Sequence, residues 1–261
     1  MRSYFLIDGM MIYDVMRAQK LMHDPEARWC APLIEGKAHR LVGPMLIDSA
    51  LAKAAGEAVS VTVGKLIIAF PARLHLSIIH SEVDLPTLTT HLRRFAAFYD
   101  DDAQLLALRL ADCRRLIDLP HLMTTEQWGD LTSLMAQWHF HDRQGQELAL
   151  SLPPDREKYR SDRPFRLSPS QLQALSYISE PDSLLNDLGY TPHTMGADMA
   201  AYWKLASQCV SIWRQSGSDQ RDVLVAFGEK VLATKGQALR GHDWPSLLAH
   251  AELQKIADIP V

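Results

Sequence analysis

Charged side chains gather between His91 and Arg115, where they could bind an anion or move a proton. This stretch holds five arginines and four aspartates, namely Arg93, Arg94, Arg109, Arg114, Arg115, Asp100, Asp101, Asp102 and Asp112. The two signs nearly cancel, and an excess of about one positive charge is too small for strong salt-dependent phosphate binding. Asp112 and His91 could act as acid and base, but no nucleophile stands at a diagnostic spacing from them.

The third interpretation of this stretch is structural. The apolar run 103–111 predicts a buried strand that carries Arg109, with Asp112 just past its end. A carboxylate in this place could pair with Arg93 or Arg114 through charge-assisted hydrogen bonds. We therefore expect Asp112 to brace a strand against a helix.

Two histidines offer the best metal-binding pattern in the sequence. His139 and His141 are two residues apart, and on a strand they would point to the same face. A zinc site needs further ligands, and the neighbouring Asp142 stands at an expected turn, where aspartate is common in any case. We expect no metal and no cofactor, and an enzyme with an unrecognised, metal-dependent site around these histidines remains the alternative.

Familiar catalytic motifs are missing from the sequence. It contains no G-x-S-x-G, H-E-x-x-H or G-x-G-x-x-G. The Gly36-Lys37 and Gly64-Lys65 pairs lack the upstream glycine and the following Ser or Thr of a phosphate-binding loop. We therefore expect a protein that is not an enzyme.

The composition is that of a globular protein. Of 261 residues, 47% are hydrophobic and 22% are charged, and the formal net charge of −4 gives no overall attraction to nucleic acid or anionic lipid. The three cysteines, Cys30, Cys113 and Cys209, fit buried positions in a reducing compartment better than a disulfide framework. The N-terminus does not resemble a signal peptide, and no apolar run approaches the ~20 residues of a membrane span. These features predict a cytoplasmic location.

Periodicity places the charged stretch within a mixed lobe of strands and helices at residues 1–152. Strands are expected at 3–8, 74–80 and 103–111, and a hairpin at 135–152 around Gly145. Helices are expected after Gly9, from Pro86 onward and over 124–135. Residues 59–70 suit a strand or a helix, and we favour the helix.

The amino-acid composition changes after this lobe. Residues 153–166 are dense in proline and charge, which predicts a solvated linker. Residues 167–261 then predict an all-α lobe, in which Ser168-Pro169 opens a helix, Gly217 and Gly236 end two others, and Asp243 with Pro245 opens the last. The predicted fold class is α+β.

The helix expected around 202–213 is apolar over most of its circumference. One row holds Trp203, Ala206, Val210 and Trp213, and a second holds Tyr202, Leu205, Cys209 and Ile212. Such a helix is either central in its lobe or covered by a partner. Because Trp and Tyr dominate the energetics of protein interfaces, Tyr202, Trp203, Trp213 and Trp244 are the candidate partner-binding residues.

Several short motifs occur in an order that resembles a known family. They are Leu6-Ile7-Asp8-Gly9, Trp29, Glu35-Gly36, Gly43-Pro44-Met45-Leu46, His91-Leu92-Arg93, Arg109 with Asp112 and Arg114, and Trp138. This order resembles the domain-of-unknown-function family 4123 (DUF4123), the effector chaperones, or adaptors, of bacterial type VI secretion. Met10, Leu110-Ala111 and Cys113 depart from the family pattern.

The resemblance implies a function and a set of partners. It implies a chaperone that binds a toxic effector and helps load it onto a VgrG or PAAR spike protein, with no nucleic-acid or membrane partner. It also makes the arginine–aspartate stretch a signature of the scaffold. The scaffold residues it implies are Asp8, Gly9, Trp29, Gly36, Gly43, Pro44, His91, Arg93, Arg109, Asp112, Arg114 and Trp138.

Overall fold

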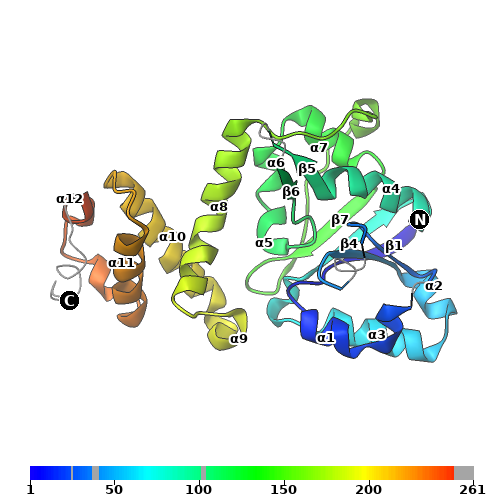
Figure 1. The fold of residues 1–261 in the computed structure, drawn as a ribbon, viewed down its shortest axis with the longest axis horizontal. Coiled ribbons are helices and arrows are strands. Elements are labelled where there is room, and N and C mark those ends of the chain that lie inside the picture. The colour runs from blue at the N-terminus through cyan, green and yellow to red at the C-terminus, as the bar shows by residue number, and fades with distance from the viewer. Residues whose placement is uncertain (25, 37–40, 101–103, 250–261) are drawn as a thin grey trace. The chain divides into compact units, whose positions relative to one another are not determined.

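A computed structural model describes residues 1–24, 26–36, 41–100 and 104–249. The chain divides into two compact units, Met1–Ala174 and Leu175–Val261. The first combines a sheet with helices and the second is helical (Figure 1), so the predicted α+β class is confirmed. None of the described helices has both the length and the apolar character that crossing a membrane requires.

The first unit is built on a six-stranded sheet in which every neighbouring pair is antiparallel. Its spatial order is β2-β3-β1-β4-β7-β8. The strands are β1 (Arg2–Asp8), β2 (Cys30–Pro32), β3 (Pro44–Asp48), β4 (Leu76–Ser81), β7 (Gln137–His141) and β8 (Glu147–Ala149). The register places Leu6 opposite both Leu46 and Ser77, and it confirms the predicted hairpin by pairing Phe140 with Leu148.

Helices lie on both sides of this sheet (Figure 1). On one side are α1 (Tyr13–Ala18), α2 (Ser49–Ala54) and α3 (Glu57–Ile67), and on the other are α4 (Leu85–Ala96) and α7 (Thr125–Thr132). Two short helices, α5 (Cys113–Leu116) and α6 (Leu119–Leu122), precede α7. Because both faces are covered, successive residues of the central strand β1, including Leu6 and Ile7, are fully buried.

The local sequence accounts for the helices that were predicted. At the start of α4 the Asp84 side chain accepts a hydrogen bond from the Thr87 amide, and Pro86 lies in the first turn. Thr124 and Gln127 form a reciprocal capping box at the start of α7. The ambiguous segment 59–70 is largely helical, as α3, which agrees with the helix that we favoured.

The expected strand over 103–111 is mostly irregular. Only Leu105–Ala107 forms a strand, β6, which pairs with β5 (Ala97–Tyr99) in a separate two-stranded sheet. Leu108 and Leu110 are buried without joining a sheet, because the chain turns inward there to fill the core. Arg109 therefore lies in an irregular corner and not on a strand, and residue 103 lies outside the described residues.

The predicted linker packs against the first unit. The Arg156 Nε donates a 2.7 Å hydrogen bond to the Met135 carbonyl, and the Tyr159 ring lies over Gly129, where a Cβ would meet the ring at 2.3 Å. Phe165 is 8% exposed and packs edge-on against Phe95, with 5.1 Å between ring centroids. The first compact unit extends to Ala174 for this reason, whereas the composition of the segment predicted a boundary at residue 152.

The helical unit follows the predicted helix ends. Its helices are the C-terminal part of α8 (Pro169–Asp187), α9 (Pro192–Met195), α10 (Met199–Gln215), α11 (Arg221–Ala233) and α12 (Trp244–Ala249). Gly217 and Gly236, just after α10 and α11, have φ of 72° and 84°, which glycine adopts without steric cost. Arg221 of α11 forms ion pairs with Glu180 and Asp187 of α8, which ties these helices together.

Candidate functional site

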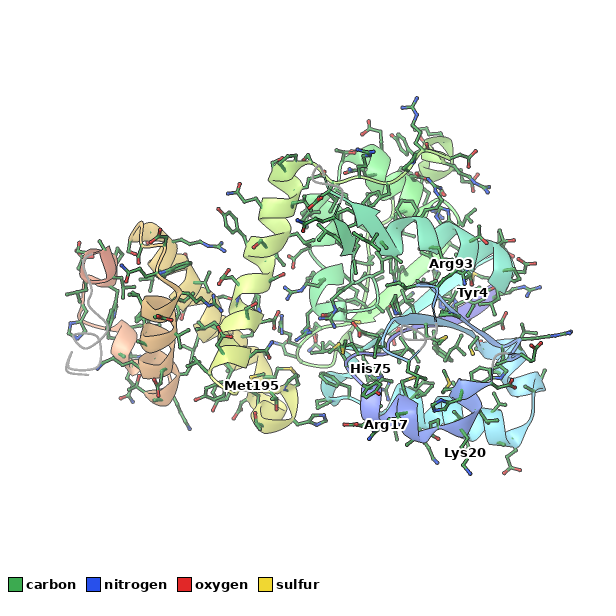
Figure 2. The ribbon with its side chains drawn as sticks, viewed as in Figure 1. Tyr4, Arg17, Lys20, His75, Arg93 and Met195 are labelled. Atoms are coloured by element: carbon green, nitrogen blue, oxygen red, sulfur yellow. The ribbon has the colours of Figure 1, made fainter. Side chains whose placement is uncertain are left out.

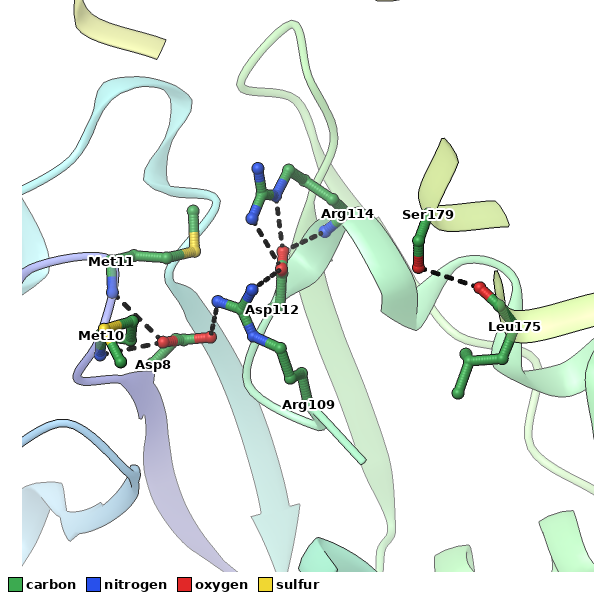
Figure 3. Close-up of polar contacts among 8 residues, drawn as sticks. All are labelled: Asp8, Met10, Met11, Arg109, Asp112, Arg114, Leu175 and Ser179. Atoms are coloured by element: carbon green, nitrogen blue, oxygen red, sulfur yellow. Dashed lines mark hydrogen bonds and ion pairs between the residues drawn. The ribbon is translucent and has the colours of Figure 1, made fainter. Parts of the chain in front are cut away.

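A continuous chain of contacts joins Asp8 to Arg109, Asp112 and Arg114 across a corner of the first unit (Figure 3). Asp112 accepts hydrogen bonds from Arg114 Nε at 2.9 Å and Nη2 at 2.8 Å, and Arg109 Nη1 lies 3.4 Å from its second oxygen. Arg109 Nη2 in turn donates a 2.7 Å hydrogen bond to Asp8 at the end of β1. The Asp8 carboxylate also accepts from the amides of Met10 and Met11. Arg109 thus joins the ends of two segments that lie far apart in the sequence.

The electrostatics of Asp112 suit a structural role. Asp112 is fully buried, which by itself raises the pKa of its carboxyl. The hydrogen bonds and the charge of Arg114, together with the charges of Arg109 and Arg115, outweigh this effect and lower the pKa below its usual value. Both carboxylate oxygens already accept hydrogen bonds, one of them from the Arg114 amide at the start of α5. Hydrogen bonds at both oxygens therefore favour the ionised form of this carboxylate.

Other residues implied by the resemblance shape the backbone beside this corner. A Cβ on Gly9 would lie 2.4 Å from the Leu41 carbonyl oxygen and 2.8 Å from that of Gly43, so only glycine fits. Pro44 begins β3 directly after this approach and pairs with Asp8. Gly36 has a φ of 113°, a conformation that favours glycine.

Arg93 makes contacts different from those predicted. Its side chain is labelled in Figure 2. Its Nε and Nη2 donate to the Pro32 carbonyl at 3.2 and 3.0 Å, and its Nη1 lies 2.6 Å from Glu35. It therefore fastens α4 to the end of β2 and does not pair with Asp112. Trp29, 6% exposed, lies just before β2, and its carbonyl accepts from the Asp48 amide at 2.9 Å.

Buried imidazole and indole groups also bond to their own unit. His91 Nε2 lies 2.9 Å from the Leu131 carbonyl, and burial lowers the pKa of this histidine. His75 is likewise buried with a lowered pKa, and its Nε2 lies 2.6 Å from the Leu66 carbonyl (Figure 2). The Trp138 Nε1 donates to the Ser77 hydroxyl at 3.0 Å. These contacts join α4 to α7, the residue before β4 to α3, and β7 to β4 inside the core.

The two candidate metal ligands have different surroundings. His139 lies 3.2 Å from Glu147 across the hairpin, whereas His141 is buried with its Nδ1 3.3 Å from the Leu76 carbonyl. Within the described parts of the chain, no group of three or more His, Cys, Asp or Glu side chains is arranged to hold a metal ion. Cys113 donates to the same Leu76 carbonyl, and burial raises the pKa of its thiol to about 12, so it is not a reactive thiolate at neutral pH.

The aromatic residues proposed for partner binding divide into two groups. Trp244 is 1% exposed, donates from Nε1 to the Ala238 carbonyl and packs on Phe227 with ring centroids 4.5 Å apart. The Trp244 indole therefore packs and bonds inside its own unit. Tyr202, Trp203 and Trp213 are only partly buried on α10, while Ala206, Cys209 and Val210 of the same helix are buried against its neighbours.

Sequence reasoning missed a group of surface cavities in the first unit. Three adjoining cavities, of about 350, 280 and 350 Å³, lie along the segment 159–166 where it crosses α4 and α7. Arg160, Arg163 and Arg166 line them, and Phe165 with Pro164 supplies an apolar part. The regular spacing of these arginines around a Pro-Phe pair could have indicated a binding surface. The segment was instead interpreted as a solvated linker.

Comparison with known proteins adds one match. Residues 3–130 match the family described as "Domain of unknown function (DUF4123)". No curated protein and no solved structure matches this chain. The matched range includes Asp8, Arg109 and Asp112, and it ends before the hairpin that carries Trp138.

Proposed function

We propose that this protein, which carries a DUF4123 domain over residues 3–130, is a chaperone or adaptor for an effector of bacterial type VI secretion. In this proposal it binds a toxic effector before export and helps to load it onto a VgrG or PAAR spike protein. The proposal rests on the family resemblance of the sequence, since the description of the matched domain assigns no activity.

One structural observation carries most of the support. Asp112, the candidate acid, is paired within the series Asp8–Arg109–Asp112–Arg114, and the candidate base His91 lies 2.9 Å from the Leu131 carbonyl, whereas Asp101 and Asp102 lie outside the described residues. Such pairing stabilises a frame, which a binding protein needs in order to present its surfaces without rearrangement. A frame of this kind agrees better with a binding role than with catalysis by the same residues.

The helical unit is the proposed source of cargo specificity. Tyr202, Trp203 and Trp213 of α10 are partly exposed, and large aromatic side chains of this kind contribute much of the free energy of protein association. An effector helix or strand that covered them would bury apolar area that otherwise stays in contact with water.

The test is co-expression with an effector encoded beside a spike gene in the same genome. A chaperone that covers apolar segments of the effector should raise its soluble yield and its secretion, because exposed apolar surface drives aggregation. The Trp203→Ala/Trp213→Ala variant is expected to lose effector retention, and Tyr177→Ala, at another exposed aromatic residue of this unit, serves as the matched control. Equal effector solubility and secretion with and without this protein would refute the chaperone role.

A further inference from the structure

Three arginines of the segment 159–166 carry charges that the fold does not use. The guanidinium groups of Arg160, Arg163 and Arg166 are exposed and form no hydrogen bond or ion pair with other described residues. In contrast, Arg94 in the same region is tied to Asp130 at 2.9 Å and to the Arg163 carbonyl at 3.2 Å. With Arg94 paired to Asp130, the cavity lining holds these three arginines against Asp162 and Glu126, so positive charge is in local excess on a chain with a formal net charge of −4.

The surface beneath these arginines is fixed in place. Phe165 is inserted between Phe95 and Phe98, with ring centroids 5.1 and 5.8 Å away. The Ser161 amide donates to Asp130 at 3.1 Å, which holds the preceding turn of the segment against α7. The three arginines therefore extend from an anchored segment, residues 160–166, which we call the strap. This anchoring lowers the entropic cost of ordering them around a ligand.

The cavities combine this charge with apolar walls. The middle cavity, of about 280 Å³, is lined by Phe98, Pro164 and Phe165 together with Arg163 and Arg166, and Asp162 brings the opposite charge to its rim. This volume is near the lower end of ligand pockets, roughly 300–1,000 Å³, so it suits an inserted side chain better than a large cofactor. An occupant that matches both features has carboxylates next to an apolar side chain.

We infer that this strap, Arg160 to Arg166, is a docking site for an acidic peptide segment of a partner protein. An apolar side chain of the segment enters the middle cavity, and its Asp or Glu side chains pair with Arg160, Arg163 and Arg166. Arginine suits this role because its planar guanidinium binds a carboxylate through two parallel hydrogen bonds. The inference deepens the proposed function, on which it rests for the identity of the partner as an effector or spike protein.

The first experiment measures fluorescence anisotropy of full-length protein with labelled peptides of about twelve residues, a length typical of docked segments. One peptide alternates Glu with Leu and Phe, the second has Gln in place of Glu, and the third has Lys. We expect the acidic peptide alone to bind, with an affinity that falls as salt is added. Equal binding of the acidic and the Gln peptide would overturn the inference, as would preferential binding of the Lys peptide.

Charge variants locate the binding to the strap. Arg163→Glu/Arg166→Glu should weaken binding of the acidic peptide by about tenfold or more, since two attractive contacts become repulsive. Lys53→Glu/Lys65→Glu changes the net charge equally at exposed positions of the same unit and should bind as the unmodified protein does. Asp162→Asn removes the opposing charge and should tighten binding about twofold to threefold. The same affinity for both double variants would refute the site.

Two further arms separate this inference from its alternatives. Inorganic phosphate and a single-stranded deoxythymidine oligonucleotide are used as competitors of the labelled acidic peptide. If the oligonucleotide displaces this peptide at a lower concentration than unlabelled acidic peptide does, the strap is a nucleic-acid site instead. The Arg163→Glu/Arg166→Glu variant is also tested for effector retention on co-expression. If the unmodified protein retains effector and this variant retains it equally, the docking site is refuted while the chaperone role stands. If the unmodified protein does not retain effector, the chaperone role fails and the peptide measurement alone decides the strap.

Discussion

Asp112 and Arg114 form a bidentate ion pair, with Nε–Oδ1 and Nη2–Oδ2 distances of 2.9 and 2.8 Å, and the Asp112 carboxylate is fully buried. The Asp112 side chain also caps α5 by accepting from the Arg114 amide. The same carboxylate contacts Arg109, which continues to Asp8 (Figure 3). One buried side chain thus links the start of a helix, an irregular corner and the end of β1.

Removal of the Asp112 carboxylate should destabilise the first unit. Asp112→Ala removes both hydrogen bonds that the Arg114 guanidinium, which is largely buried, donates to this carboxylate, and it removes a helix cap. We expect a loss of about 3 kcal/mol in the free energy of unfolding, measured by urea denaturation. Asp14→Ala breaks an exposed pair with Arg17 and should cost less than about 0.5 kcal/mol. A similar small loss for Asp112→Ala would contradict its bracing role.

The contribution of Asp112 should depend on pH in a defined direction. The pKa of this carboxyl is lower in the folded protein than in the unfolded chain. Its stabilisation is therefore complete above the unfolded pKa, about 4, and is lost as the pH falls through the folded pKa. The difference in unfolding free energy between the unmodified protein and Asp112→Asn should be largest near neutral pH and shrink in acid. Urea titrations at several pH values between 7 and 3 provide the measurement, and a difference that does not change with pH would refute this account.

Two glycines should respond to alanine in opposite ways. Gly9→Ala places a methyl group against two carbonyl oxygens, so we expect a destabilisation of about 1–3 kcal/mol. Gly64 lies on the exposed face of α3, where an added Cβ would meet no other atom within 4 Å. Gly64→Ala should stabilise the protein by up to about 1 kcal/mol, because alanine is the better helix former. Thermal melting of both variants checks the pair, and loss of stability in both would show that the close approach at Gly9 is not the cause.

The end of the first unit can be tested by truncation. A chain that ends at Ala174 keeps the strap and should fold with a cooperative melting transition. A chain that ends at Leu152 loses Phe165 and uncovers the apolar surface of Phe95 and Phe98, so it should melt at lower temperature and aggregate. Scanning calorimetry and light scattering distinguish the two chains. Equal stability of both would show that the segment 153–166 adds nothing to the first unit.

The sequence by itself determined those elements whose signals are local. Pro86 in the first turn predicted the start of α4, and the apolar runs around Gly145 predicted the β7–β8 hairpin. The pairing of Asp112 with Arg114 was also predictable, because the two residues are only two positions apart. In each case the residues that form the structure are neighbours in the chain, so their spacing already specifies the geometry.

Only the tertiary structure decided which distant groups meet. Asp8 and Arg109 are 101 positions apart, and their contact depends on how β1 and the corner after β6 pack in three dimensions. The same holds for the packing of Phe165 on the first unit and for the burial of Trp244 beside Phe227. Composition made the strap resemble a solvated linker because most of its side chains are charged, yet a few apolar side chains anchored it. The burial of each residue is set by the sum of contacts over the whole fold, and local periodicity does not contain that sum.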